Sequence, residues 1–193
     1  MNRAEELRLL GRAQRGDRDA FAALYRANVQ AIFRYIVHRV GDAALAEDFT
    51  ADVFVRALKS LATYEDQGKP LVAWLYRIAH ARVVDHYRRV GRRPAEDDLD
   101  EGSEVAIQPD MDQSLFRRQM AQMLRQAITG LTDEQQQVVV LRFVEGCSLE
   151  EAAQVMGKNA NAIKALQHRA LRSLAGRLER AGLDIDDILS GLS

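Results

Sequence analysis

Hydrogen-bond donors of several kinds gather on one face of the segment 161–178 if it forms a helix. At 100° per residue, one side of that helix is apolar and carries Ile163, Leu166, Ala170 and Leu174. The opposite side carries Asn161, Lys164, Ala165, His168, Arg169 and Arg172. Amide, imidazole, ammonium and guanidinium groups donate to base edges and phosphates, and a small alanine lets the backbone approach a groove. This face therefore suits nucleic acid.

The residues before this helix predict how it is positioned. Thr132 with Gln135, and Ser148 with Glu151, have the spacing of capping boxes, so two further helices should precede it. Gly157-Lys158-Asn159 then forms a tight turn in which Asn159 caps the next helix and becomes a further candidate DNA contact. Two short helices joined by a glycine-containing turn are typical of the helix-turn-helix, whose second helix enters the major groove. A plain helical hairpin with a basic surface is the alternative.

Glycine and capping residues indicate where helices begin and end along the rest of the chain. Gly16-Asp17 and Gly41-Asp42 each predict a helix end followed by the N-cap of a new helix. Further helices are expected over 43–61 and from Pro70, which is a favoured first-turn residue. No segment shows sustained period-two alternation of β-branched residues. The predicted fold class is all-α.

The charge is unevenly distributed, although the formal net charge is only −1. Segment 74–93 has six arginines against one aspartate, and segment 158–180 has six basic residues against one glutamate. Between them, segment 95–112 has eight acidic residues and no basic one. Glycine, serine and proline within it, and the lack of periodic apolar residues, predict a flexible linker between two small helical domains. The basic segments suit nucleic acid, but basic helix faces are more often plain solvated surface.

Composition argues against several classes of protein. Of the 193 residues, 47% are hydrophobic, which is enough for one medium core or two small ones. The lone cysteine, Cys147, excludes an intramolecular disulfide, and the four histidines form no metal-ligand pair. No phosphate-binding loop or nucleophile elbow is present. We therefore expect no catalytic residue, no metal and no cofactor. The lack of a long apolar run predicts no membrane insertion and a cytoplasmic location.

Several blocks together resemble one family. The stretch 131–174, LTDEQQQVVVLRFVEGCSLEEAAQVMGKNANAIKALQHRALRSL, resembles the sigma4 domain of extracytoplasmic-function (ECF, group IV) sigma factors, the small members of the sigma-70 family. The N-terminal half resembles their sigma2 domain in three ordered blocks: DAFAALYRANVQAIFRYIV (19–37), AEDFTADVFVRAL (46–58) and WLYRIAHARVVDHYRR (74–89). The ordered set is more specific than any single block.

The resemblance implies four parts with different roles. Residues 1–93 would be a sigma2-like domain that binds core polymerase and recognises and melts the minus-ten element. Residues 94–112 would be the acidic linker, threaded through the polymerase channel. Residues 113–180 would be a sigma4-like helix-turn-helix domain that recognises the minus-thirty-five element, and 181–193 a C-terminal tail. The implied function is that of an alternative sigma factor, which directs transcription initiation.

The resemblance also assigns the polymerase contact to the helix 46–58. In the family this helix binds the clamp helices of the β′ subunit, which makes Asp48, Asp52 and Phe54 candidates. An apolar arc on the helix, wider than the stripe of about 100° that one-sided packing needs, consists of Leu45, Phe49, Val53, Phe54, Leu58 and Leu61. The part of the apolar arc that lies beyond this stripe would face a partner. A helix surrounded by its own bundle explains the same arc.

The loop after this helix lies where the family captures a flipped base of the minus-ten element. Stacking or amide groups and a mobile backbone suit an unpaired base, and the candidates are Tyr64, Gln67, Gly68 and Lys69. Phosphate contacts are expected from Arg77, His80, Arg88 and Arg89 on the next helix. Trp74 is assigned to the core, and Asp85 is expected to brace Arg82 or Arg89. A solvent-exposed turn is the alternative for the loop.

The implied partners are core RNA polymerase (its β and β′ subunits), promoter DNA and an anti-sigma factor. The chain departs from the family pattern at Ala81, where asparagine is usual, and at Asn161-Ala162, where Gly-Thr is usual. One rival is a LuxR-type helix-turn-helix regulator, because 146–164 also resembles that motif. It would need a sensory domain of alternating strands and helices, which the helical N-terminal half does not predict. A helical enzyme is the other rival.

Overall fold

A computed structural model describes residues 1–90 and 111–182, with the backbone alone for 111–119. In chain order the helices are α1 (Arg3–Gln14), α2 (Arg18–Val40), α3 (Ala43–Ser60), α4 (Leu71–Val90), α5 (Met111–Thr129), α6 (Asp133–Val139), α7 (Leu149–Met156) and α8 (Ala160–Arg180). A 3₁₀ turn at Leu61–Thr63 follows α3, and a π-helical turn at Val140–Val144 follows α6. The described residues form no strand, so the predicted all-α fold is confirmed. None of the helices described is both long and apolar enough to cross a membrane.

The predicted caps lie at the helix boundaries. Asp17 and Asp42 accept hydrogen bonds from backbone N–H groups in the first turns of α2 and α3. Gly41 adopts the left-handed conformation that ends α2, with φ of 76°. Ser148 and Asn159 cap α7 and α8 in the same way. Because a cap satisfies the first free N–H groups of a helix, these short-range bonds fix where each helix begins.

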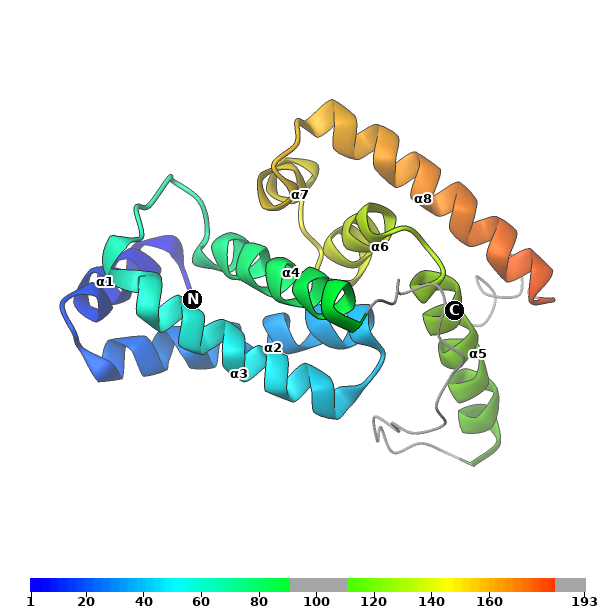
Figure 1. The fold of residues 1–193 in the computed structure, drawn as a ribbon, viewed down its shortest axis with the longest axis horizontal. Helices are drawn as coiled ribbons and strands as arrows, with labels where there is room; N and C mark the ends of the chain where they lie inside the picture. Colours follow the sequence, from blue (N-terminus) through cyan, green and yellow to red (C-terminus); the bar gives the residue numbers. More distant parts are fainter. Residues whose placement is uncertain (91–110, 183–193) are drawn as a thin grey trace.

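The N-terminal half is a bundle built around α2. Figure 1 shows α3 and α4 lying beside α2, with α1 at the end where the chain begins. The buried face of α2 contributes Leu24, Ile32, Tyr35 and Ile36 to the core, and α3 and α4 contribute Phe49, Val53, Leu75 and Val83. These residues follow the helical repeat of the sequence, so one face of each helix is buried.

The C-terminal half packs α8 across α6 and α7. Its core consists of Val138, Leu141, Val155, Ile163, Leu166 and Ala170. Near the C-terminal end of α8, Ala127 of α5 and Leu178 form a smaller cluster with Met120, Met123 and Leu174. Figure 1 shows α8 as a long helix along the outer edge of the C-terminal half, with α6 beside it.

The two halves are packed against each other, which the sequence did not predict. α4 lies against α7, and α2 lies against the π-helical turn. The buried residues of both halves form one continuous cluster. The predicted acidic linker lies outside the described residues, apart from Met111 and Asp112, which begin α5. Of the predicted tail, 183–193 also lies outside them.

Candidate nucleic-acid and polymerase interfaces

The face of α8 predicted to read DNA is exposed along its whole length. Exposed side chains lie at Asn161, Lys164, Ala165, His168, Arg169 and Arg172. The opposite face is buried through Ile163, Leu166 and Ala170. Neither α6 nor α7 covers the polar side, because both pack on the apolar one. The helix can therefore donate from amide, imidazole, ammonium and guanidinium groups to one groove.

The turn before α8 holds this face in a fixed direction. Gly157 adopts φ of 64° and ends α7, and the N–H of Lys158 donates to the carbonyl of Ala153 at 2.9 Å. The Asn159 side chain then accepts from the N–H of Ala162 at 2.8 Å, so this candidate DNA contact is engaged as the cap of α8. Lys158 also pairs with Glu134 of α6 at 2.8 Å. The helix-turn-helix geometry predicted from the caps is present.

A pocket of about 340 Å³ lies beside the loop between α3 and α4. Its volume falls in the range of small-ligand clefts. It is lined by Ser60, Thr63, Tyr64, Glu65, Gln67, Lys69, Pro70, Ala73, Trp74, Arg77 and Gln154. The predicted Tyr64, Gln67 and Lys69 thus lie together with an arginine that was assigned to phosphate. The fourth loop residue, Gly68, adopts φ of 75°, which L side chains rarely adopt.

Among the pocket residues that the sequence did not place there, Trp74 and Gln154 come from outside the loop. Trp74, which we assigned to the core, lies with its ring centroid 4.5 Å from that of Tyr64, at an interplanar angle of 44°. The two rings form an aromatic wall on which a base can stack. Burial raises the pKa of Tyr64, so its phenol stays neutral and able to donate. Gln154 reaches the pocket from α7, and the sequence carries no signal for that long-range contact.

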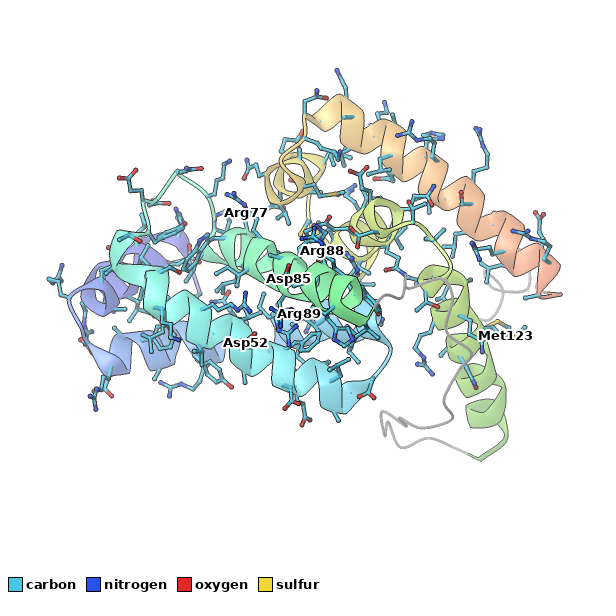
Figure 2. All side chains as sticks on the ribbon, viewed as in Figure 1. Asp52, Arg77, Asp85, Arg88, Arg89 and Met123 are labelled. Atoms are coloured by element: carbon cyan, nitrogen blue, oxygen red, sulfur yellow. The ribbon has the colours of Figure 1, made fainter. Side chains whose placement is uncertain are left out.

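The candidate phosphate contacts on α4 separate into two groups. Arg77, Arg88 and Arg89 are exposed and are labelled along α4 in Figure 2. His80 instead faces α6, with its Nε2 3.8 Å from an Asp133 carboxylate oxygen. Burial lowers the pKa of His80, with the charge of Arg39 as a further cause. In this arrangement His80 belongs to the contact between the two halves rather than to an open basic surface.

On α3, the polymerase candidates differ in exposure. Asp48 is exposed, whereas Asp52 is half-buried and accepts from Arg82 at 2.7 Å. Arg82 is thus paired with Asp52, whereas we expected Asp85 to brace either Arg82 or Arg89. Phe54 is only 5% exposed and packs edge-on against Tyr25, so the structure places it in the core rather than on the surface.

Other apolar side chains of α3 do face outward. Leu58 is 54% exposed and Val55 is 49% exposed, and both lie on the same helix as Asp48. Most of the apolar arc predicted from the sequence therefore packs inside the N-terminal bundle, because Phe49, Val53 and Leu61 are buried. Leu58 is the part of the arc left open to a partner.

Two ion pairs join α2 to the C-terminal half. The Glu145 side chain, only 1% exposed, accepts from Tyr76 Oη and from Arg34 Nη2, each at 2.9 Å. Burial, followed by the charge of Glu145, raises the pKa of Tyr76, so its hydroxyl keeps its proton and donates. The fully buried Arg39 pairs with Asp133 and lies 3.3 Å from Tyr35 Oη. In the described part of the chain, no cluster of side chains suited to a metal ion occurs.

Family models match both halves. Sigma-70 region 2 matches residues 24–93, and Sigma-70 region 4 matches residues 121–174. The ECF RNA polymerase sigma factor BldN of Streptomyces coelicolor is 40% identical over 174 residues, which cover 89% of this chain and 65% of BldN. The chain thus spans slightly less than two thirds of BldN. The RNA polymerase sigma factor YlaC of Bacillus subtilis is 32% identical, with 85% of this chain and 95% of YlaC covered.

Solved structures of other proteins share the fold. CnrH, in complex with the cytosolic domain of CnrY, matches with a TM-score of 0.70 and 25% identity, covering 92% of this chain and 98% of CnrH. RpoE of Bartonella quintana, in complex with the anti-sigma factor NepR, matches with a TM-score of 0.63 and 26% identity, covering 82% and 96%. The findings do not support the LuxR-type alternative, because both matched regions are sigma-70 regions in the expected order. The chain belongs to the sigma-70 family, as an alternative RNA polymerase sigma factor of the ECF group.

Proposed function

We propose that this sigma factor divides promoter recognition between the pocket beside the 64–69 loop and the exposed face of α8. The pocket would take one unpaired base of the minus-ten element, and α8 would read the upstream element in the major groove. The observation that carries this proposal is the segregation of α8. Its polar and basic side chains are exposed, whereas its apolar ones are buried. A helix so arranged presents donors without any rearrangement of its domain.

The pocket supports the minus-ten assignment through its chemistry. Tyr64 and Trp74 offer an aromatic wall, and Gln67 an amide that hydrogen-bonds in both directions. Lys69 and Arg77 lie at the same pocket and would attract the flanking phosphates. Arg88 and Arg89 extend the exposed basic surface of α4 towards its C-terminal end. The proposed route of the single strand therefore runs along α4.

We assign the polymerase contact to the outer surface of α3. Asp48 is exposed there beside the open apolar side chains of Val55 and Leu58. Asp52 lies on the same helix but already pairs with Arg82 and Arg56. Phe54 would support this surface from beneath, because its ring packs on Tyr25.

Domain boundaries, location and partners complete the proposal. Residues 1–93 and 113–180 would act as the two promoter-reading domains, in the cytoplasm, without catalysis by the chain itself. CnrH and RpoE of Bartonella quintana are each solved with a bound protein, for RpoE an anti-sigma factor. Their likeness to this chain supports an anti-sigma partner here as well.

The upstream assignment is tested by salt-dependent DNA binding of single variants. We expect Arg172→Ala to reduce the log-log salt slope by about one unit on any sequence, because it removes one phosphate contact. His168→Ala should instead cost roughly 1 to 3 kcal/mol at the preferred site alone, because it removes a base contact. Arg18→Ala, at an exposed arginine on α2, is the matched control. Unchanged binding by the two α8 variants would remove α8 from the DNA interface.

A further inference from the structure

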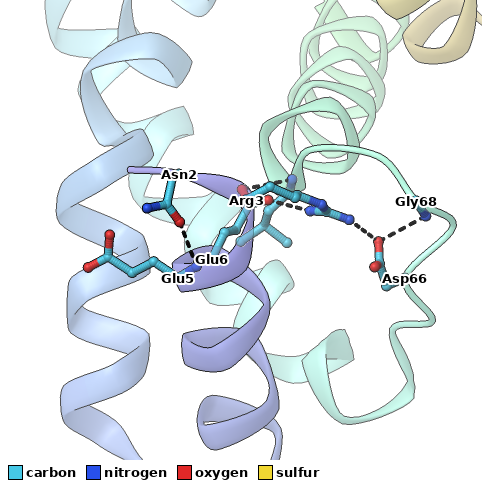
Figure 3. A network of polar contacts seen from close by, with 7 residues as sticks. Asn2, Arg3, Glu5, Glu6, Asp66 and Gly68 are labelled. Carbon is cyan, nitrogen blue, oxygen red and sulfur yellow. Dashed lines mark hydrogen bonds and ion pairs between the residues drawn. The ribbon is translucent and has the colours of Figure 1, made fainter.

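The helix α1 lies outside the segment that matches sigma-70 region 2, which begins at residue 24. It nevertheless touches the loop that forms the pocket. Figure 3 shows the N-terminal turn of α1 beside this loop, with polar side chains reaching across to it. These contacts join residues more than forty positions apart in the chain. They are therefore built by the fold rather than by local sequence.

The start of the loop is held by one glutamine. Gln14 Nε2 donates to the carbonyl of Leu61 at 3.1 Å and to the carbonyl of Tyr64 at 2.7 Å. Tyr64 is the residue whose ring faces Trp74 in the pocket. Because a carbonyl held by a side chain cannot rotate freely, these two hydrogen bonds fix the backbone from which the Tyr64 ring projects.

The middle and end of the loop are held by one charged network. Arg3 pairs with both Glu6 and Asp66. Asp66 also accepts from the N–H of Gly68 at 3.1 Å, and Glu6 accepts from the N–H of Leu71, the first residue of α4, at 3.0 Å. Figure 3 shows these links running in series from α1 through the loop. Glu6 is buried, so its charge is shielded from water and fixed by these donors.

The network leaves the base-contacting groups free. Gln67 and Gly68 are exposed, and Arg3 bonds the loop at Asp66, which does not line the pocket. The contacts of α1 thus shape the loop from behind while Tyr64, Gln67 and Lys69 line its open side. Gly68 takes a left-handed backbone conformation within this held segment.

We propose that α1 is a positioning element for minus-ten recognition, in which Arg3 and Gln14 hold the 64–70 loop in the shape that selects one unpaired base. The inference rests on the proposed function of the pocket. Neither Arg3 nor Gln14 touches the DNA in this account. They act through the loop, so their loss should reduce the preference for one base rather than remove DNA binding. If the loop is already ordered, it loses little conformational entropy when the base enters.

The test uses holoenzyme assembled from core polymerase and the full chain. The probe is a pool of fork-junction DNA with a randomised minus-ten segment, and bound molecules are sequenced. Gln14→Met keeps the length of the side chain and Arg3→Met keeps most of its apolar stem, while both substitutions remove the hydrogen-bond donors. We expect each to reduce the preference at one unpaired position by about fivefold or more, within the discrimination that one base contact provides. Preferences at the other positions should change little, whereas Arg3→Met should lower the thermal midpoint because the buried Glu6 loses its ion-pair partner.

Two controls separate this inference from simpler explanations. Arg8→Met changes an exposed arginine on the same helix and should leave the base profile unchanged. A weaker affinity for all sequences, with the base profile intact, would mean that α1 only stabilises the fold and would overturn the inference. Tyr64→Ala and Gln67→Ala test the pocket itself. If they erase the preference while Arg3→Met and Gln14→Met keep it, the positioning role alone fails. If Tyr64→Ala and Gln67→Ala also keep the base preference, the pocket assignment fails.

Discussion

Partly buried histidines give the fold an acid-sensitive component at the level of single residues. Burial lowers the pKa of His38, His80 and His86 below the ordinary value of 6.5. The folded chain therefore binds fewer protons than the unfolded chain as the pH falls below 6.5. The stabilisation due to the neutral rings is complete above that pH and is lost as the pH falls towards the folded pKa values.

We expect the free energy of unfolding, measured with urea, to be lower at about pH 5.5 than at about pH 7.5. The carboxylate Asp17, whose pKa is lowered by backbone hydrogen bonds, acts in a more acidic range and does not account for this window. His80→Gln should flatten the dependence, whereas His168→Gln, at an exposed position, should not. A steeper loss in acid for the His80 variant would show that its burial does not matter.

Residues with local signals were predictable, and residues with distant partners were not. The exposed face of α8 follows from helical geometry, because inward positions recur every three to four residues. Trp74 packs against the core as predicted, but the sequence did not show that it also lines the pocket or that Phe54 is buried, since an apolar ring carries no sign of which neighbour covers it. Phe54 packs on Tyr25 of another helix, and Trp74 meets Tyr64 across a loop. Arg3 and Gln14 gave no signal, because their partners lie far along the chain.

At the scale of elements, the turn between α7 and α8 is set by one backbone conformation. Gly157 adopts φ of 64°, a conformation that costs L residues with a Cβ roughly 1 to 2 kcal/mol. We expect Gly157→Ala to lower the free energy of unfolding by that amount and to weaken upstream DNA binding, because α8 loses its fixed direction. Chemical denaturation and DNA titration of the same samples measure both effects.

Gly176 supplies a control with the opposite sign. It lies within α8, its backbone is not in the left-handed region, and a Cβ there would meet nothing within 4 Å. Alanine at this position should stabilise the chain by about 0.5 to 1 kcal/mol, because glycine loses more freedom in a helix. Equal effects of the two substitutions would contradict the role given to the turn.

The N-terminal ends of the helices were predicted more closely than the hydrogen-bond pattern near their C-terminal ends. Asp17, Asp42, Ser148 and Asn159 cap the helices that the sequence assigned to them. The helix that begins after Thr132 passes into a π-helical turn at Val140–Val144, which the capping box does not predict. Propensity does not distinguish the two hydrogen-bond patterns, and the turn lies where α2 packs against it.

At the scale of the whole molecule, the contact between the two halves depends on Glu145. Its buried carboxylate is the acceptor for Tyr76 and Arg34. We expect Glu145→Ala to lower the free energy of unfolding by about 1 to 3 kcal/mol, because it leaves the Tyr76 hydroxyl without its acceptor. The radius of gyration from small-angle X-ray scattering should rise as the halves separate.

Glu150→Ala is the matched control, because Glu150 is an exposed carboxylate on α7. An unchanged radius and stability in the Glu145 variant would mean that apolar packing alone holds the halves together. The sequence did not predict this contact. Arg34 and Glu145 are 111 positions apart, and Arg39 and Asp133 are 94 apart, so neither pair has a local pattern.

Run-off transcription tests the central claim most directly. Purified core polymerase is combined with this chain and a library of promoter fragments, and the RNA products are mapped. We predict discrete start sites that require the chain and that shift or disappear when the pocket residue Tyr64 or the α8 residue Lys164 is replaced by alanine. Only background transcription across the whole library, at a level equal to that of core polymerase alone, would contradict the account of this chain as a sigma factor.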